Sequence, residues 1–94
     1  MKKIISHKLY DTETAELIAV YEGETLYKSL KGTYFLYGDI GDLIYRYGGP
    51  FPLLSADENG NDICLLSTKD AREWAIHRLP ADEYISIFGE VEAG

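Results

Sequence analysis

The chain has 94 residues, of which 46% are hydrophobic and 27% charged, so it can close one modest core and is too short for two ordinary domains. Nine Lys and Arg against sixteen Asp and Glu give a formal net charge of -7, which argues against direct nucleic-acid binding. The single cysteine excludes an intrachain disulfide, and no apolar run approaches the length of a membrane span or signal sequence. We therefore expect one soluble, cytoplasmic domain over residues 1–94.

The first part of the chain predicts a strand or small hairpin followed by a helix. Residues 2–10 place two short apolar pieces around a polar centre, as a strand or hairpin does. Apolar or partly apolar residues from Thr14 to Tyr21 then recur at i, i+3, i+4 and i+7, which predicts a helix over residues 12–21. Gly23 follows, where glycine adopts the left-handed cap of a helix without steric cost.

The middle of the chain predicts strands. Residues 24–30 and 33–37 are β-rich runs joined by a glycine-containing turn and form the clearest predicted hairpin. Both faces of the second run are apolar, which is typical of a central strand. A further strand is expected at residues 43–47, and residues 51–54 and 63–66 flank an Asn-Gly turn that predicts a second hairpin.

The last part of the chain predicts two helices. Ser67 begins a capping pattern, and helical spacing continues to about Arg78. Pro80 suits the start of a third helix, which the pattern ends before Gly89, with residues 90–94 frayed. The predicted fold is α+β: an antiparallel sheet of four to five strands with about three short helices packed on one face.

Catalytic and metal-binding patterns are not evident in the sequence. Cys64, His7 and His77 lie far apart and lack the paired spacing of a zinc site. The turn at residues 57–62 begins like a calcium loop but lacks its glycine and bidentate glutamate. Cys64 lies in an apolar run typical of a buried thiol, and His77 follows Glu73 by four residues, as in a solvated helical pair. We expect no enzyme activity, no metal and no cofactor.

The negative charge is concentrated away from the N-terminal part of the chain. Residues 1–31 carry five basic and five acidic side chains, whereas residues 32–66 carry one basic and five acidic ones. Carboxylates in turns can take the place of phosphates in a basic groove of a partner, although acids in turns also simply keep a small domain soluble. Tyrosines beside these acids resemble an interaction patch, or cover the sheet with hydroxyls that reach water. The candidate partner-binding residues are Tyr37, Asp39, Asp42, Tyr45, Tyr47, Asp57, Glu58 and Asp62.

Most of the chain apart from residues 39–62 resembles a family of small acidic proteins found in phages and mobile elements of Gram-positive bacteria. The blocks that carry the resemblance are residues 3–15, 26–38 and 66–74, with 82–84 and 87–89. The resemblance supplies no catalytic residues. The setting of the family in mobile elements implies antagonism of host defence, including anti-CRISPR activity.

Three hypotheses follow. The first is a non-enzymatic inhibitor in the bacterial cytoplasm that mimics nucleic acid and binds a basic nucleic-acid site on a defence protein, such as a CRISPR effector. The second is a small structural or regulatory module, a monomer or a homodimer formed through an exposed edge strand and its tyrosines. The third, a small enzyme using Cys64 or His77, is the most distant. None of the three involves a membrane or direct nucleic-acid binding.

Overall fold

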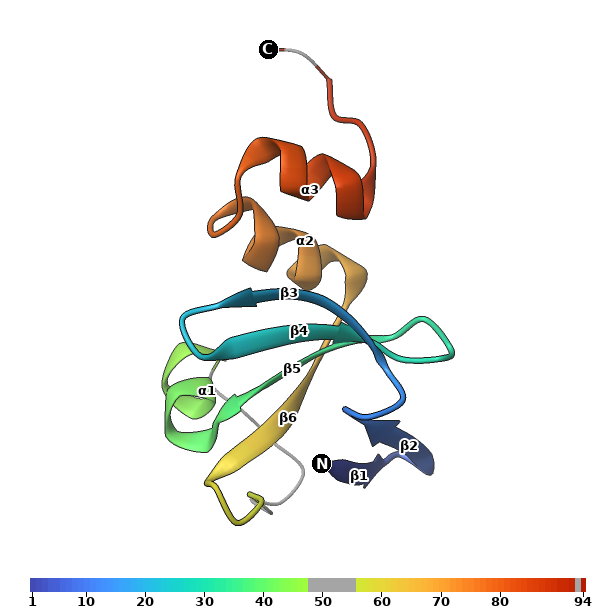
Figure 1. Ribbon diagram of the computed structural model, residues 1–94, viewed down its shortest axis with the longest axis vertical. Coiled ribbons are helices and arrows are strands. Elements are labelled where there is room, and N and C mark those ends of the chain that lie inside the picture. Colours follow the sequence, from blue (N-terminus) through green and yellow to red (C-terminus); the bar gives the residue numbers. More distant parts are fainter. Residues whose placement is uncertain (48–55, 93) are drawn as a thin grey trace.

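The structure is a computed structural model that describes residues 1–47, 56–92 and 94. Its strands are β1 (Lys2–Ile5), β2 (Lys8–Asp11), β3 (Glu16–Tyr21), β4 (Glu24–Lys28), β5 (Tyr34–Asp39) and β6 (Asn61–Leu66), and its helices are α1 (Ile40–Tyr47), α2 (Thr68–Ile76) and α3 (Ala81–Phe88). β1 and β2 form a two-stranded sheet, and the other strands form a four-stranded sheet in the order β3-β4-β5-β6 (Figure 1). All pairings are antiparallel, which confirms the predicted α+β class.

Strand β5 lies inside the four-stranded sheet between β4 and β6. Its register pairs Leu36 with Leu26 and Phe35 with Tyr27. Phe35 and Leu36 point to opposite faces of the sheet, and both are 0% exposed. The hairpin predicted from residues 24–30 and 33–37 and the central position of its second strand are therefore confirmed.

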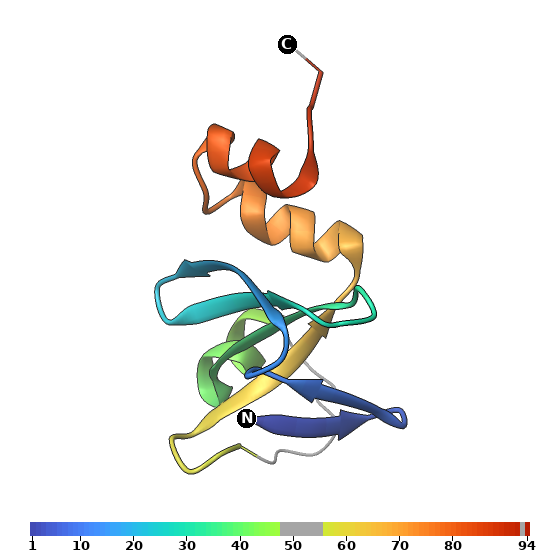
Figure 2. The ribbon, with the colours of Figure 1, turned by 45° about the vertical axis from the view of Figure 1, so that its right-hand side comes forward.

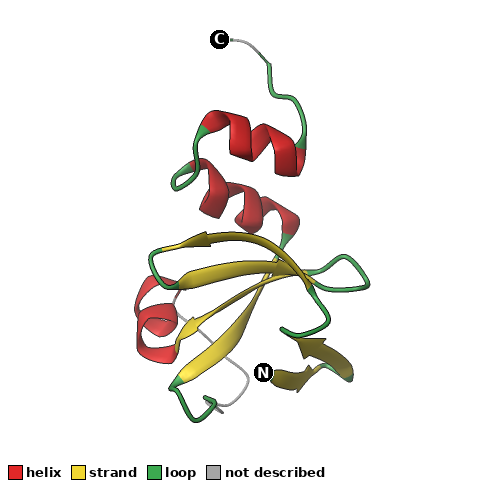
Figure 3. Ribbon diagram, in the orientation of Figure 1, coloured by secondary structure: helices red, strands yellow, loops and turns green. Residues whose placement is uncertain are grey.

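Helices α1 and α2 pack on one face of the four-stranded sheet, and α3 packs on α2 on the same side, farther from the strands (Figure 3). Leu43 of α1, Trp74 of α2 and Tyr84 of α3 belong to one buried cluster with Leu26 and Leu36 of the sheet. Burial of such side chains contributes roughly 1.5–3 kcal/mol each relative to exposure. This packing agrees with the predicted arrangement of helices on one side.

The hairpin of β1 and β2 covers part of the opposite face (Figure 2). Ile5 and Tyr10 pack against Phe35 and Ile63 in a second buried cluster. The rings of Tyr10 and Phe35 meet edge to face, with centroids 5.8 Å apart. Because both faces of the sheet are covered at β5, the strand is apolar on both sides.

The predicted helix over residues 12–21 is wrong, because strand β3 occupies its second half. Glu22 and Gly23, with φ of 45° and 82°, form the two-residue turn that folds β3 back onto β4. The register shifts between Leu17 and Ala19, as at a β-bulge. This irregularity breaks the two-residue alternation of the strand, so its apolar residues imitate helical spacing.

The predicted strand at residues 43–47 is also wrong, because these residues belong to α1. A strand would place Leu43, Tyr45 and Tyr47 on one face. Instead Leu43 is 0% exposed and Tyr45 is 90% exposed, as helical geometry requires. Asp39 immediately before α1 supplies the cap that starts the helix.

The two C-terminal helices agree with the sequence. The Ser67 hydroxyl accepts a hydrogen bond from a first-turn backbone N–H of α2 at 3.0 Å, and α3 follows Pro80. The C-cap of α3 is Gly89, with φ of 94°. Of the second predicted hairpin, residues 63–66 lie in β6, which pairs with β5, whereas residues 51–54 lie outside the described residues.

Candidate protein-binding surface

An acidic surface forms where β5 ends and α1 begins, beside the turn that leads into β6. Asp39 at the end of β5 pairs with Asn61 of β6, and the Ile40 N–H donates to the Gly60 carbonyl at 2.9 Å. The start of α1 and the turn before β6 are thereby joined. We call the exposed acidic side chains on these two segments, together with the exposed Tyr45, the acidic corner, which comprises Asp39, Asp42, Tyr45 and Glu58.

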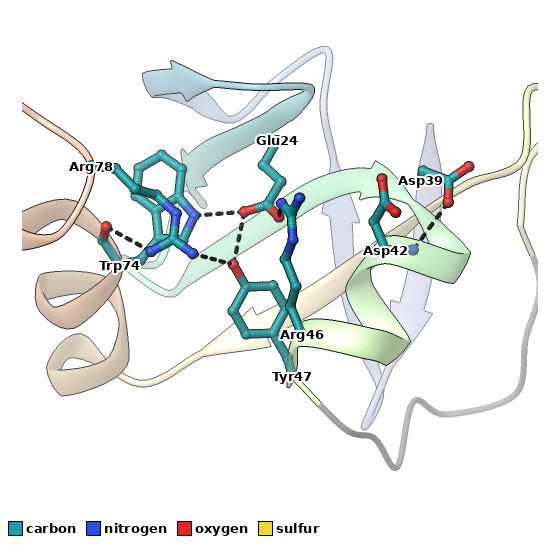
Figure 4. Close-up of polar contacts among 7 residues, drawn as sticks. All are labelled: Glu24, Asp39, Asp42, Arg46, Tyr47, Trp74 and Arg78. Atoms are coloured by element: carbon teal, nitrogen blue, oxygen red, sulfur yellow. Dashed lines mark hydrogen bonds and ion pairs between the residues drawn. The ribbon is translucent and has the colours of Figure 1, made fainter.

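Capping of α1 fixes the position of two of these acids. The Asp39 Oδ1 accepts a hydrogen bond from the Asp42 N–H at 3.0 Å (Figure 4). A Cβ atom at Gly41 would lie 3.1 Å from the same oxygen, so glycine leaves room for the cap. The Asp42 carboxylate lies in the first turn of α1, where negative charge is favourable.

Tyr45 adds an aromatic ring to the same surface of α1. It follows Asp42 by three residues, which places both on neighbouring positions of one helix face. Arg46 is the only basic residue between residues 32 and 66, and its guanidinium forms an ion pair with Glu24. The cation that α1 itself carries is therefore already paired with an internal carboxylate.

Asp57 and Tyr37 stabilise the turn behind the acidic corner. The half-buried Asp57 carboxylate accepts hydrogen bonds from the Tyr37 hydroxyl and from the N–H groups of Asn59 and Asn61, the latter two at 3.0 Å. The hydrogen bond from Tyr37, followed by those from the backbone, lowers the pKa of Asp57. The same hydrogen bond raises the pKa of Tyr37. Both predicted binding residues are therefore engaged inside the protein.

Asp62 does not lie on the surface. It is 0% exposed, and its Oδ1 lies 2.6 Å from the Lys3 Nζ. The same oxygen accepts the Ile63 N–H at 2.7 Å, while the buried Oδ2 has no hydrogen-bond partner. This ion pair joins β1 to β6, so Asp62 holds the N-terminal hairpin on the sheet and is not part of the acidic corner.

Tyr47 points inward to a buried carboxylate, Glu24, that is 2% exposed. The Glu24 Oε1 accepts hydrogen bonds from the Tyr47 hydroxyl and the Trp74 Nε1, each at 2.7 Å, and Oε2 accepts from Arg46 (Figure 4). Burial raises the pKa of Glu24, but the hydrogen bonds from Trp74, Tyr47 and Arg46 outweigh burial and hold the pKa below its ordinary value. Glu24, at the start of β4, thus joins α1 and α2.

Arg78 extends this network from the end of α2. Its guanidinium donates to the Tyr47 hydroxyl at 3.2 Å and to the Trp74 carbonyl at 3.1 Å, and it lies 5.4 Å from the Trp74 ring centroid. Burial, followed by the hydrogen bond to Glu24, raises the pKa of Tyr47. Glu24 is not among the residues predicted from the sequence, although strand alternation places it on the same side as the buried Leu26.

A cavity of about 360 Å³ lies between β6 and α2 and includes Cys64 and His77 in its wall. Burial, followed by nearby carboxylates, raises the pKa of the Cys64 thiol to about 11, so the thiol is protonated at neutral pH. Its hydrogen bond goes to the Leu65 carbonyl at 3.8 Å. The His77 Nε2 lies 3.4 Å from the Glu73 carboxylate on the exposed surface of α2. The described contacts therefore give Cys64 no base that would activate it.

Among the described residues, no three His, Cys, Asp or Glu side chains are grouped closely enough to hold a metal ion. None of the helices in this part of the chain has the length and hydropathy needed to span a membrane. Comparison with family models, with curated proteins and with solved structures gave no match.

Proposed function

We propose that the protein is a non-enzymatic inhibitor whose acidic corner binds a basic, nucleic-acid-binding surface of another protein. The observation that carries the proposal is that exposed carboxylates of Asp39, Asp42 and Glu58 lie on two segments joined by a backbone hydrogen bond, one of which also carries Tyr45, which is 90% exposed. Carboxylates held in this way can pair with the lysines and arginines that otherwise contact phosphates. Bound protein then excludes nucleic acid from the same surface.

The rigid support of these side chains favours binding. The cap of α1, its bond to the turn before β6, and the Glu24 network hold the segments that carry the acids. Side chains on a fixed frame lose less conformational entropy when they bind. Tyr37, Asp57 and Tyr47 serve this frame, and Asp62 anchors the N-terminal hairpin.

Tyr45 is the proposed anchor of the interface. Aromatic side chains contribute large contact area with few rotatable bonds, and they are frequent among the residues that dominate binding energy. The net charge of -7 adds long-range attraction to a basic partner and speeds encounter. The interaction is therefore expected to weaken as salt increases.

The class of partner follows from the resemblance to proteins of phages and mobile elements. A protein of such an element meets host defence in the bacterial cytoplasm, where RNA-guided nucleases expose basic channels for nucleic acid. A CRISPR effector is therefore the proposed partner, and the protein acts as an anti-CRISPR mimic of nucleic acid.

The test uses capture of proteins from the lysate of a CRISPR-bearing bacterium. Wild-type protein is compared with the Asp39→Asn, Asp42→Asn, Glu58→Gln variant, in which Asn at residue 39 keeps a capping side chain. The control carries Glu13→Gln, Glu90→Gln and Glu92→Gln and loses the same number of exposed charges. We expect wild type and control to retain an effector subunit at low salt and the corner variant to lose it. Equal capture by the corner variant contradicts the proposal.

Self-association remains a second candidate, because β3 is an edge strand with exposed apolar side chains. Leu17 is 56% and Val20 58% exposed, and their partners Tyr27 and Thr25 place both on the hairpin-covered face of the sheet. Exposed edges of this kind pair readily with a second copy. Sedimentation over a concentration series tests this function: a dimer that Val20→Lys dissociates supports it, and a monomer at all concentrations excludes it.

A further inference from the structure

A groove of about 550 Å³ lies between β2 and the turn that joins β4 to β5. One wall is the run of β2 from Lys8 to Asp11, and the other is formed by Ser29, Leu30 and Lys31. We call it the basic groove. It shares no residue with the acidic corner, from which β5 separates it by roughly 20 Å, given about 3.3 Å per residue of strand.

The rim of the basic groove carries apolar side chains that are exposed to solvent. Leu9 is 58% and Leu30 84% exposed, whereas Tyr10 in the same wall is 5% exposed. Ala15 adds a further small apolar surface. Apolar side chains that flank a concave surface are typical of binding sites and favour a ligand that carries an apolar group.

The net charge of the residues that line the groove is opposite in sign to the charge of the whole chain. Lys8 and Lys31 both line it and are exposed. Its only acid, Asp11, is 6% exposed and accepts the Glu13 N–H at 2.9 Å. The residues that line the groove therefore carry a formal net charge of +1 on a protein of net charge -7, which favours an anionic ligand.

The backbone of Leu9 offers a free donor and acceptor at this place. Ser6 and His7, with φ of 51° and 66°, form a two-residue hairpin turn, so Ile5 and Lys8 exchange backbone hydrogen bonds. In the next residue pair of the ladder, which contains Leu9, the backbone N–H and carbonyl groups point outward. Those of Leu9 therefore point away from β1. Among the described residues, no turn or loop hydrogen bond occupies these groups.

The neighbouring residue of the same edge supports this orientation. Asp11 lies two residues after Leu9, so its backbone groups point the same way. Its carbonyl accepts hydrogen bonds from the N–H groups of Thr14 at 3.2 Å and Ala15 at 2.9 Å. Thr14 and Ala15 also line the basic groove. The outward edge of β2 therefore faces the groove, and the Leu9 position of that edge is open to a partner.

Both walls of the groove are held in place before any ligand binds. The Lys3–Asp62 ion pair and the Tyr10–Phe35 contact fix the N-terminal hairpin on the sheet. In the opposite wall, the Ser29 N–H donates to the Thr33 carbonyl at 2.8 Å and the Thr33 N–H donates to the Ser29 hydroxyl at 3.0 Å. A preformed groove loses little entropy on binding.

We propose that the basic groove binds an extended acidic peptide segment of another protein, whose backbone pairs with Leu9 and whose apolar side chain lies between Leu9 and Leu30. Strand addition supplies hydrogen bonds from the peptide backbone, and Lys8 and Lys31 select acidic flanking residues. A fatty acid would use the lysines and the apolar walls but has no backbone to pair with Leu9. The inference is independent of the function proposed for the acidic corner.

The test is an NMR titration of the full chain with the capped peptide acetyl-Asp-Glu-Val-Glu-Asp-amide. We expect a downfield shift of the Leu9 amide and slower hydrogen exchange at that amide. A peptide with Asn and Gln in place of its acids should bind about fivefold more weakly. A peptide N-methylated at Val, which lacks the donor to the Leu9 carbonyl, should also bind about fivefold more weakly.

Variants of the chain complete the test. Lys8→Gln with Lys31→Gln should weaken binding of the acidic peptide about fivefold, whereas Lys69→Gln with Arg72→Gln on α2 should leave it unchanged. The proposal is wrong if the Leu9 amide does not move at millimolar peptide, or if the N-methylated peptide binds equally well. It is also wrong if decanoate displaces the peptide and alone reproduces the Leu9 shift, or if that amide shifts with protein concentration without peptide.

Discussion

The acidic corner and the basic groove lie at opposite ends of β5 and differ in shape as well as in charge. The corner presents carboxylates and one exposed tyrosine on a helix and a turn, so its selectivity depends on side chains. The groove is concave and places an open strand edge between two lysines, so it recognises a backbone as well as charge. Each region depends on its own ion pair with a buried carboxylate, which allows the two to be tested separately.

The largest expected effect is the loss of the ion pair that supports the groove. Lys3→Met leaves the Asp62 carboxylate buried and unpaired, which should lower the free energy of unfolding by about 3 kcal/mol. Urea denaturation measures this change. Because the N-terminal hairpin is then poorly anchored, peptide binding at the groove should fall while partner binding at the corner persists. The double variant Lys3→Met, Asp62→Leu should recover part of the lost stability; no recovery would show that the pairing is not the cause.

The second effect concerns the carboxylate that supports the corner. Glu24→Gln removes the charge that accepts hydrogen bonds from Trp74, Tyr47 and Arg46, and should cost about 2 kcal/mol at pH 7. Urea denaturation of both proteins measures the cost. The variant should bind the corner partner more weakly, because α1 is less firmly held, and should bind the groove peptide normally.

The difference in unfolding free energy between wild type and Glu24→Gln should change with pH in a defined direction. The pKa of Glu24 is lower in the folded protein than its ordinary value of 4.5. Its contribution to stability is therefore complete above that value and is lost as the pH falls through the folded pKa. The stability gap between wild type and Glu24→Gln should narrow below about pH 4. A gap that stays constant from pH 7 to pH 3 would contradict this account.

A smaller effect separates the two roles of Asp39. Asp39→Ala removes both the cap of α1 and a surface charge, and should lower the free energy of unfolding by about 1 kcal/mol. Asp39→Asn keeps a capping oxygen and should leave stability nearly unchanged. Both variants should weaken binding of the corner partner. If Asn costs as much stability as Ala, the cap does not account for the loss.

The smallest effect on stability is expected at the exposed side chains of each region. Tyr45→Ala and Leu30→Ala should change the free energy of unfolding by less than about 0.5 kcal/mol, because both side chains are mostly in solvent. Calorimetry measures this change. Tyr45→Ala should weaken only the corner interaction, and Leu30→Ala only the groove interaction. If either variant weakened binding at the other region, the two regions would be coupled.

The sequence predicts regular elements where local signals agree with long-range pairing. The cap at Ser67, the glycine after α3 and the apolar faces of residues 33–37 each identify their element correctly. The patterns around the bulge in β3 and the exposed Tyr45 of α1 predict the wrong elements. Pairing and burial against residues far away in the sequence decide those elements. Local pattern alone cannot report such contacts.

The candidate surface was predicted in part. Composition identifies Asp39, Asp42 and Glu58 as acids in turns, and the structure places all three at the surface. Composition cannot distinguish them from Asp62, because the Lys3 that pairs with Asp62 lies 59 residues away in the chain. For the same reason the partners of Glu24 could not be predicted, since they lie on helices that follow much later in the sequence.

The most direct measurement is competition at the captured partner. Fluorescently labelled nucleic acid is bound to the purified partner protein, and its anisotropy is followed as wild type, the acidic-corner variant or the charge-matched control is added. The account predicts that wild type and control displace the nucleic acid, that displacement weakens as salt rises, and that the corner variant fails to displace it. Formation of a ternary complex, in which partner, nucleic acid and wild-type protein stay bound together, would contradict the account.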